Sequence, residues 1–197
     1  MMIKIVVIGE IGSGKTFVAN EFGYPVFDAD KQVSKIYKND KKCFFQIKKK
    51  FPKENITYPI KKSDIRKLIL KNQKNIFKIN KIVHPIVRNQ MKKFIYKNKN
   101  MKGVVLDIPL FLENKLNKKG YILVYVQSKK KDINKRLKLR IGYSLKLLNI
   151  LKKLQLSIEL KKKKSHFIIK NNFKKFYLKK NVKLIKNKIL ENERSSS

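Results

Sequence analysis

The amino-acid sequence predicts an α/β fold in which a parallel five-stranded sheet is flanked by helices. Five short segments rich in Val, Ile, Leu, Phe or Tyr are predicted to be buried strands. Longer helical or irregular stretches separate them, which is typical of the crossover connections in a parallel sheet. A glycine-rich loop at residues 9–16 lies between the first segment and a helical pattern, the context expected of a phosphate-binding loop.

The expected strands are residues 3–8, 25–27, 103–108, 121–126 and 166–169. Ligands of open parallel sheets bind at the carboxyl ends of the strands. The phosphate loop, Asp28, Asp30, Asp107 and Gln127 all lie at the carboxyl ends of expected strands, so we expect a ligand site at this edge of the sheet.

The chain is predicted to form a single domain, residues 1–197, that consists of a core and two insertions. The core comprises about residues 1–30, 101–130 and 165–197. The first insertion, about residues 31–100, has apolar residues at helical spacing in three stretches, 65–70, 76–83 and 86–96. We therefore expect a helical region that covers the site, with a helix boundary at His84-Pro85.

The second insertion, about residues 131–164, is expected to form a small helical lid. It contains a leucine-rich helix at 145–156, and the lysine run at 161–164 is interpreted as a solvated helix end. A terminal helix over 173–190 is expected to pack on the sheet, and residues 191–197 are expected to be frayed.

Composition restricts the class of protein. With 42% hydrophobic residues the chain can bury a core, so global disorder is excluded. No apolar run is long enough to span a membrane. The single cysteine, Cys43, allows no internal disulfide, and a reducing cytoplasm is the expected location.

The charge is extreme, with 51 Lys and Arg against 13 Asp and Glu and a formal net charge of +38. One interpretation is binding to nucleic acid or to an anionic membrane. The other is codon bias, because the lysines are dispersed along the whole chain and accompany abundant Asn, Ile and Phe. We favour codon bias and expect neither a specific nucleic acid nor a membrane as a partner. The sequence predicts no oligomeric state.

Residues 9–16 match the phosphate-loop pattern G-x-x-x-x-G-K-[ST] at every fixed position. Glycines let backbone N–H groups approach phosphate oxygens, and the following helix directs its positive end toward them. Lys15 is expected to contact the β- and γ-phosphates, and Thr16 to bind Mg²⁺. The expected ATP-binding residues are Gly12, Ser13, Gly14, Lys15, Thr16 and Phe17.

Carboxylates follow two other strands. Asp30 is either a base that accepts the proton of an attacking hydroxyl or a helix N-cap, and the sequence leaves both alternatives open. Asp107 either contacts Mg²⁺ through water or caps a turn. Arg136 and Arg140 are four residues apart, on one face of a predicted helix, where their planar groups can clamp phosphate.

Four motifs follow one another along the chain: Gly12-Ser13-Gly14-Lys15-Thr16, Asp28-Ala29-Asp30, His84-Pro85-Ile86-Val87-Arg88 and Asp107-Ile108-Pro109-Leu110-Phe111-Leu112-Glu113. In this order and spacing the set resembles the dephospho-CoA kinase family. The C-terminal third continues the resemblance through Arg136, Arg140, Gln155, Lys161, Ile169 and Asn171. The resemblance therefore spans nearly the whole chain.

The resemblance implies a phosphate-loop kinase that uses Mg²⁺ and transfers the γ-phosphoryl group of ATP to the ribose 3′-hydroxyl of dephospho-CoA. It implies that Lys15, Asp30 and Arg140 are catalytic and that Thr16 and Asp107 hold the metal. The implied acceptor-binding residues are Asp30, His84, Arg88, Pro109 and Leu110.

The chain departs from the family pattern in the lid and around the last strand. Leu151 replaces an arginine, His166 and Lys170 replace acidic residues, and Phe173 replaces a small residue. Two alternative functions are kept. One is another small-molecule or nucleoside monophosphate kinase with a different acceptor region. The other is a basic, nucleotide-switched protein that binds nucleic acid.

Overall fold

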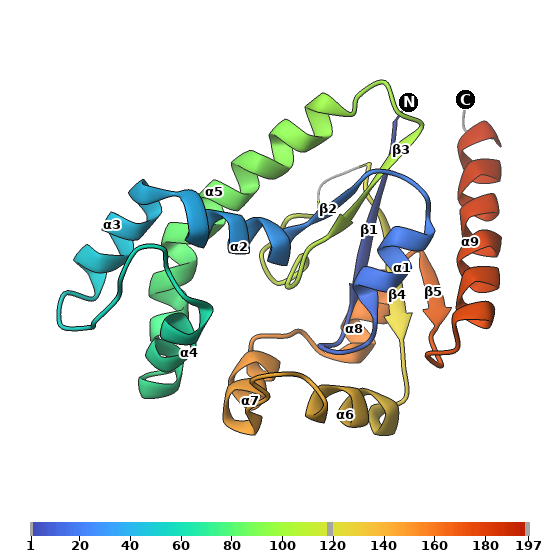
Figure 1. Ribbon diagram of the computed structural model, residues 1–197. Coiled ribbons are helices and arrows are strands. Elements are labelled where there is room, and N and C mark those ends of the chain that lie inside the picture. The colour runs from blue at the N-terminus through green and yellow to red at the C-terminus, as the bar shows by residue number, and fades with distance from the viewer. Residues whose placement is uncertain (1, 118–119, 196–197) are drawn as a thin grey trace. The chain divides into compact units, whose positions relative to one another are not determined.

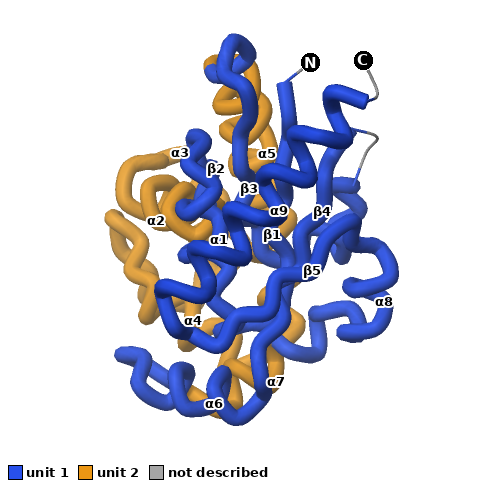
Figure 2. The backbone as a smooth tube through the Cα atoms, turned by 90° about the vertical axis from the view of Figure 1, so that its right-hand side faces the viewer, with its two compact units in different colours: residues 1–28, 98–143, 152–197 blue, residues 29–97, 144–151 orange. Residues whose placement is uncertain are grey.

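The structure is a computed structural model that describes residues 2–117 and 120–195. The chain divides into two compact units (Figure 2). The first consists of residues 1–28, 98–143 and 152–197, and the second of residues 29–97 and 144–151. The insertion expected over residues 131–164 therefore contributes to both units.

A five-stranded parallel sheet forms the centre of the first unit (Figure 1). Its strands are β1 (Ile3–Gly9), β2 (Val26–Asp28), β3 (Gly103–Asp107), β4 (Ile122–Gln127) and β5 (Phe167–Lys170). Their order is β2-β3-β1-β4-β5, and all neighbouring pairs are parallel. The predicted fold class is confirmed, and no strand end differs from its prediction by more than one residue.

A hydrophobic core joins the sheet to α1 (Lys15–Glu21) and α9 (Lys175–Ser195) (Figure 1). Val7 of β1, Val18 of α1 and Val182 of α9 belong to this core. All residues of β3 are buried, as is typical of a parallel sheet covered on both faces. Because β1 and the start of α1 are both anchored in the core, the loop between them has a fixed entry and exit.

The terminal helix α9 continues to Ser195. The expectation of fraying is therefore wrong for residues 191–195, while residues 196 and 197 lie outside the described part of the chain. The physical reason is burial, because Ile189 lies in the core and holds the last turns of the helix against the sheet.

The second unit is largely helical. It contains α2 (Ala29–Asn39), α3 (Lys41–Lys50), α4 (Lys62–Lys71) and α5 (Asn75–Lys97). Helices α2, α3 and α4 each pack against α5. The helical character expected of the first insertion agrees with these elements.

Helix α5 runs through Pro85 without a break, so the predicted helix boundary at His84-Pro85 is wrong. A proline inside a helix removes one backbone hydrogen bond. Pro85 is exposed, which lets water satisfy the carbonyl that loses its partner. Burial on both sides of the proline, by Val83 before it and Met91 after it, holds the helix together.

Three shorter helices follow β4. They are α6 (Lys130–Lys138), α7 (Leu145–Lys153) and α8 (Ile158–Lys163). Helix α7 ends three residues before the predicted end at 156, and Ser157 caps the separate helix α8 by accepting a hydrogen bond from the Leu160 amide at 3.2 Å. Among the residues that the structure describes, no helix combines the length and the apolar character needed to cross a membrane.

Candidate active site

The phosphate loop turns between β1 and α1 on glycines. Gly12 and Gly14 have φ angles of 88° and 90°, in the region that side chains avoid. A Cβ on Gly12 would lie 3.0 Å from Cγ of Leu137, and a Cβ on Gly14 would collide with Nδ2 of Asn171. Both positions therefore require glycine for conformation and for space.

Two side chains from neighbouring strand ends hold the backbone of the loop. Asn171, which follows β5, donates from Nδ2 to the Ser13 carbonyl at 2.8 Å. Ser128, which follows β4, donates from Oγ to the same carbonyl at 3.0 Å. These bonds fix the loop to the ends of two strands, so its turns are organised before a ligand binds. The sequence did not predict a role for Ser128, because an isolated serine after a strand carries no motif.

The structure brings together Lys15, Thr16 and Asp107, three of the predicted site residues. Nζ of Lys15 donates to the carbonyls of Glu10 and Gly9, at 2.8 and 3.2 Å. Oγ1 of Thr16 donates to Oδ2 of Asp107 at 2.5 Å. Asp107 is buried at the end of β3, which pairs with β1. Its side chain binds Thr16, which supports the metal-site alternative over a turn cap.

Thr16 and Asp107 present the oxygen ligands that Mg²⁺ prefers. Asp28, the last residue of β2, is the register partner of Asp107, so a second carboxyl group lies at the end of the neighbouring strand. Mg²⁺ in phosphoryl-transfer sites takes one or two protein groups and fills its remaining positions with phosphates and water. The donor set at this edge therefore fits the predicted metal.

A small hollow adjoins Lys15 within the first unit. The loop after β3, residues 108–113, lines most of it, and Lys161 of α8 completes it. Pro109 and Leu110, the residues that the resemblance assigns to the acceptor, belong to this loop. The structure thus places two predicted acceptor residues beside the predicted phosphate-binding lysine.

Asp30, His84 and Arg88 belong to the second unit. Asp30 lies inside the first turn of α2, so the alternative that it is the N-cap is wrong. Its carboxylate is close to the positive end of the helix dipole, where a negative charge stabilises the helix. His84 and Arg88 are one turn apart on α5 and share a face of that helix. Their roles toward the acceptor, and that of Asp30, stay predictions.

Arg136 and Arg140 do not share a helix face, contrary to the prediction. Helix α6 ends at Lys138, and the Arg140 amide donates to the Leu137 carbonyl at 3.1 Å in the turn that follows. Arg136 stacks instead on the ring of Phe173, with its guanidinium carbon 4.5 Å from the ring centroid. The sequence identified Phe173 only as a departure from the family pattern and missed this contact.

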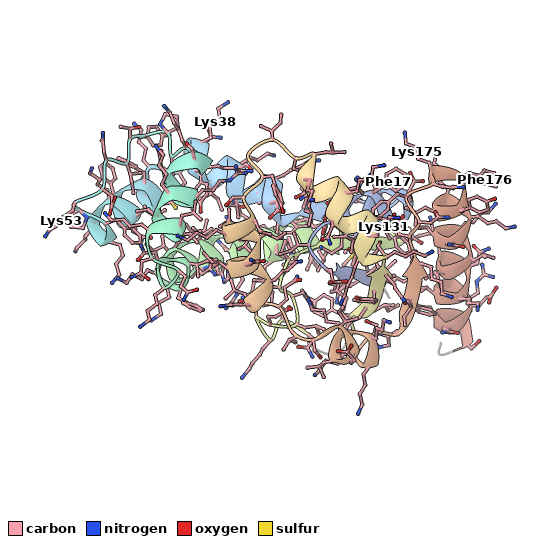
Figure 3. The ribbon with its side chains drawn as sticks, turned by 90° about the horizontal axis from the view of Figure 1, so that it is seen from below. Phe17, Lys38, Lys53, Lys131, Lys175 and Phe176 are labelled. Carbon is pink, nitrogen blue, oxygen red and sulfur yellow. The ribbon has the colours of Figure 1, made fainter. Side chains whose placement is uncertain are left out.

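Phe17, which was predicted to bind ATP, is partly buried against the core of the first unit. It lies on α1, which packs against α9. Figure 3 labels it on the same part of the molecule as Lys175 and Phe176, at the start of α9. A contact between Phe17 and the nucleotide stays a prediction.

Lys161 is buried, whereas the sequence predicts a solvated helix end over 161–164. Its Nζ lies 2.9 Å from Oε1 of Glu113, a residue to which the sequence gave no role of its own. Helix α8 packs against β1, and this tertiary contact draws Lys161 inward. The resemblance contains both residues, but nothing in their spacing indicates that they form a pair.

Cys43 is not a candidate nucleophile. Its thiol is free and fully buried in α3. Burial, and then the nearby Asp40 carboxylate, raise the pKa of this thiol to about 11. Because the thiolate is the reactive form, a thiol that stays protonated at neutral pH is an inert core residue.

The sheet order, the phosphate loop and the carboxylates at the strand ends define the class of this protein, a phosphate-loop kinase fold. Solved structures share it. A Thermus thermophilus crystal structure has a TM-score of 0.75 at 24% identity, covering 93% of this chain and 96% of that chain. A shikimate kinase from Bacteroides thetaiotaomicron has a TM-score of 0.56 at 12% identity, covering 97% and 99%. At these identities the likeness shows the fold.

Sequence comparisons identify the family within this class. Residues 3–175 match the family model for dephospho-CoA kinase. A dephospho-CoA kinase of Wolbachia pipientis wMel is 36% identical over 180 residues, which cover 89% of this chain and 92% of the relative. A dephospho-CoA kinase of Rickettsia typhi is 31% identical over 193 residues, covering 94% and 97%. The chain belongs to the dephospho-CoA kinase family. It is therefore an enzyme, a kinase, and membership of this family implies that ATP is its co-substrate.

Proposed function

We propose that this chain transfers the γ-phosphoryl group of ATP to the ribose 3′-hydroxyl of dephospho-CoA, giving CoA and ADP. The structural observation that carries the proposal is the phosphate loop, in which Lys15 is followed by Thr16 bonded to Asp107, a donor set that fits Mg²⁺. Membership of the dephospho-CoA kinase family supports the same reaction. We also propose a cytoplasmic location, which accords with the single, free cysteine Cys43.

In the proposed reaction the acceptor 3′-oxygen attacks the γ-phosphorus. The bond from this phosphorus to the β,γ-bridging oxygen breaks, and ADP leaves with the electron pair. Asp30 accepts the proton that the attacking hydroxyl loses. Lys15 directs positive charge at the β- and γ-phosphate oxygens, and Arg140 adds a planar donor fork. Pro109, Leu110, His84 and Arg88 are proposed to bind the acceptor.

Thr16 and Asp107 would hold Mg²⁺, with Asp28 on the adjacent strand. Bound Mg²⁺ supplies positive charge that offsets the negative charge of the phosphates. The hydrogen bond from Thr16 Oγ1 to Asp107 Oδ2, at 2.5 Å, keeps the two oxygens together in advance. Less reorganisation is then needed when a ligand arrives.

The direct test is to incubate the purified full chain with ATP, Mg²⁺ and dephospho-CoA and to separate the products by liquid chromatography with mass detection. We expect CoA and ADP in equal amounts. The matched control replaces dephospho-CoA by CoA, which has no free 3′-hydroxyl and should yield no product. Absence of CoA formation by folded protein that still binds ATP would refute the proposal.

The two alternative functions are not favoured by the comparisons, and each has its own assay. Nucleoside monophosphates offered as acceptors should give no diphosphate above background. The 51 basic residues should bind DNA or RNA weakly and without sequence preference, and this binding should disappear as salt rises, because it rests on counterion release. Tight binding to one RNA that persists at high salt would favour the nucleic-acid alternative.

A further inference from the structure

Lys161 is the one lysine that is buried in the described part of the chain, with 3% of its surface exposed. Lysine is almost never buried unless its charge is paired. The partner here is Glu113, whose Oε1 lies 2.9 Å from Nζ of Lys161 and which is itself largely buried. Removing two charges from water is costly, so a buried pair of this kind is weak evidence for stability and calls for another role.

Glu113 joins two segments that are far apart in the sequence. The same Oε1 atom accepts a hydrogen bond from the Leu156 amide at 2.9 Å, immediately before Ser157, the cap of α8. Lys161 follows one turn later on that helix. One carboxylate oxygen therefore fixes both the entry to α8 and the lysine within it.

The loop that carries Glu113 has a constrained backbone. Leu110 and Lys115 have φ angles of 58° and 52°, which are unfavourable for residues other than glycine. Asn114 holds the turn, since its backbone amide and its Nδ2 both donate to the Leu110 carbonyl, at 2.9 and 2.8 Å. Glu113 lies between the two strained positions. Such strain persists only where the surroundings over-determine the conformation, and the partners of Glu113 are part of those surroundings.

Pro109, Leu110 and Lys161 line the hollow beside Lys15. We infer that the Glu113–Lys161 pair is a positioning device for the loop after β3, which holds Pro109 and Leu110 where the acceptor meets the phosphate loop. This inference rests on the proposed function. Glu113 and Lys161 are positioning residues in it, because they act through the loop and need not touch a substrate.

Loss of the pair should affect the acceptor far more than ATP. A shift of about 1 Å at a reacting site can cost on the order of 10²-fold in rate. We therefore expect Lys161→Met and Glu113→Gln each to lower kcat/KM for dephospho-CoA by roughly tenfold to a hundredfold. The KM for ATP should change little, because Asn171 and Ser128 hold the phosphate loop independently.

The matched control is Lys163→Met, which removes the same charge from an exposed position on the same helix. It should leave all kinetic constants unchanged. Lys161→Arg should keep most of the kcat/KM for dephospho-CoA that Lys161→Met loses, because arginine retains the positive charge opposite Glu113. The Glu113→Gln/Lys161→Met double variant should be no slower than the slower single variant, because the two residues act as a unit. Effects that multiply would mean independent roles and overturn the inference.

If the Glu113–Lys161 pair only stabilises the fold, a different result is expected. Lys161→Met and Glu113→Gln would then lower the free energy of unfolding, while kcat and both KM values, measured per folded molecule, would stay at wild-type levels. Glu113→Gln keeps an oxygen for the Leu156 amide, so it provides a folded variant if Lys161→Met does not fold. Hydrogen exchange in peptides over residues 108–116 adds a readout that needs no turnover. Faster exchange in both variants would support the inference that the pair positions this loop. If wild-type protein made no CoA, that result would refute only the proposed function and not this inference. Unchanged exchange overturns the inference.

Discussion

The phosphate loop and the segment that follows β4 both bring charged groups to the carboxyl edge of the sheet, but they are held differently. In the loop the backbone itself is fixed, because Asn171 and Ser128 both donate to the Ser13 carbonyl. Positive φ angles at Gly12 and Gly14 complete the arrangement. The conformation of the loop is therefore determined mainly by main-chain geometry.

In the segment after β4, single side chains are fixed by distant partners. Arg136 stacks on Phe173, and Lys161 pairs with Glu113. Arg140 lies exposed in the turn after α6. The comparison indicates that substitutions in the loop should affect ATP and catalysis together, whereas those in the later segment should act one residue at a time.

Lys15→Ala should have one of the two largest effects on turnover. The Lys15 ammonium group donates to two carbonyls of the loop in the structure. When ATP binds, this group is expected to contact the β- and γ-phosphates and to offset their negative charge. We expect turnover to fall on the order of 10³-fold, as for the loss of a preorganised donor to the transferred group, with little change in the free energy of unfolding. Steady-state kinetics and urea unfolding measure both, and Lys180→Ala on α9 is the control. If Lys15→Ala left turnover unchanged, the assignment of residues 9–16 as a phosphate-binding loop would be wrong.

Asp30→Asn tests whether a single side chain of the second unit, proposed as the base, also acts on its own. The change keeps the size of the side chain but removes the proton acceptor. We expect turnover to fall by about 10²–10⁴-fold, while ATP affinity, measured by calorimetry, is retained. If only the free energy of unfolding falls, Asp30 serves the N-terminus of α2 and another group is the base.

Asn171→Ala tests whether the loop depends on its backbone anchors. The variant loses the bond to the Ser13 carbonyl and leaves the Phe173 amide without its acceptor. We expect the free energy of unfolding to fall by about 1–3 kcal/mol and ATP to bind more weakly. The control is Asn172→Ala, which removes only an exposed bond to the Lys174 amide. Equal effects of the two variants would show that Asn171 is no special anchor.

The same contrast explains how much could be predicted from the sequence. The motif at residues 9–16 predicted the loop, and β-branched runs predicted all five strands, because both depend on local backbone preferences. Thr16 and Asp107 were predicted together because strands of a parallel sheet end at one edge.

The errors lie where tertiary packing overrides local preference. Pro85 suggested a helix end, but burial on both sides carries α5 through it. The lysine run suggested a solvated end, but a carboxylate from another segment buries Lys161. Partners such as Ser128 are invisible to motif analysis, since each contributes one bond from a site distant in the sequence.

Arg140→Lys and Arg136→Lys separate two roles within the segment after β4, and Arg136→Lys has the smallest expected effect of this series. Lysine keeps the charge but loses the planar fork. If Arg140 acts on the transferred phosphoryl group, Arg140→Lys should lower kcat by at least about tenfold, since one charge-assisted hydrogen bond is worth about 1.5–3 kcal/mol, with a smaller change in ATP affinity. Arg136→Lys should do less, because the structure already engages Arg136 with Phe173. Small and equal effects would mean that this segment supplies no catalytic arginine, as the leucine at 151 and the histidine at 166 would then suggest.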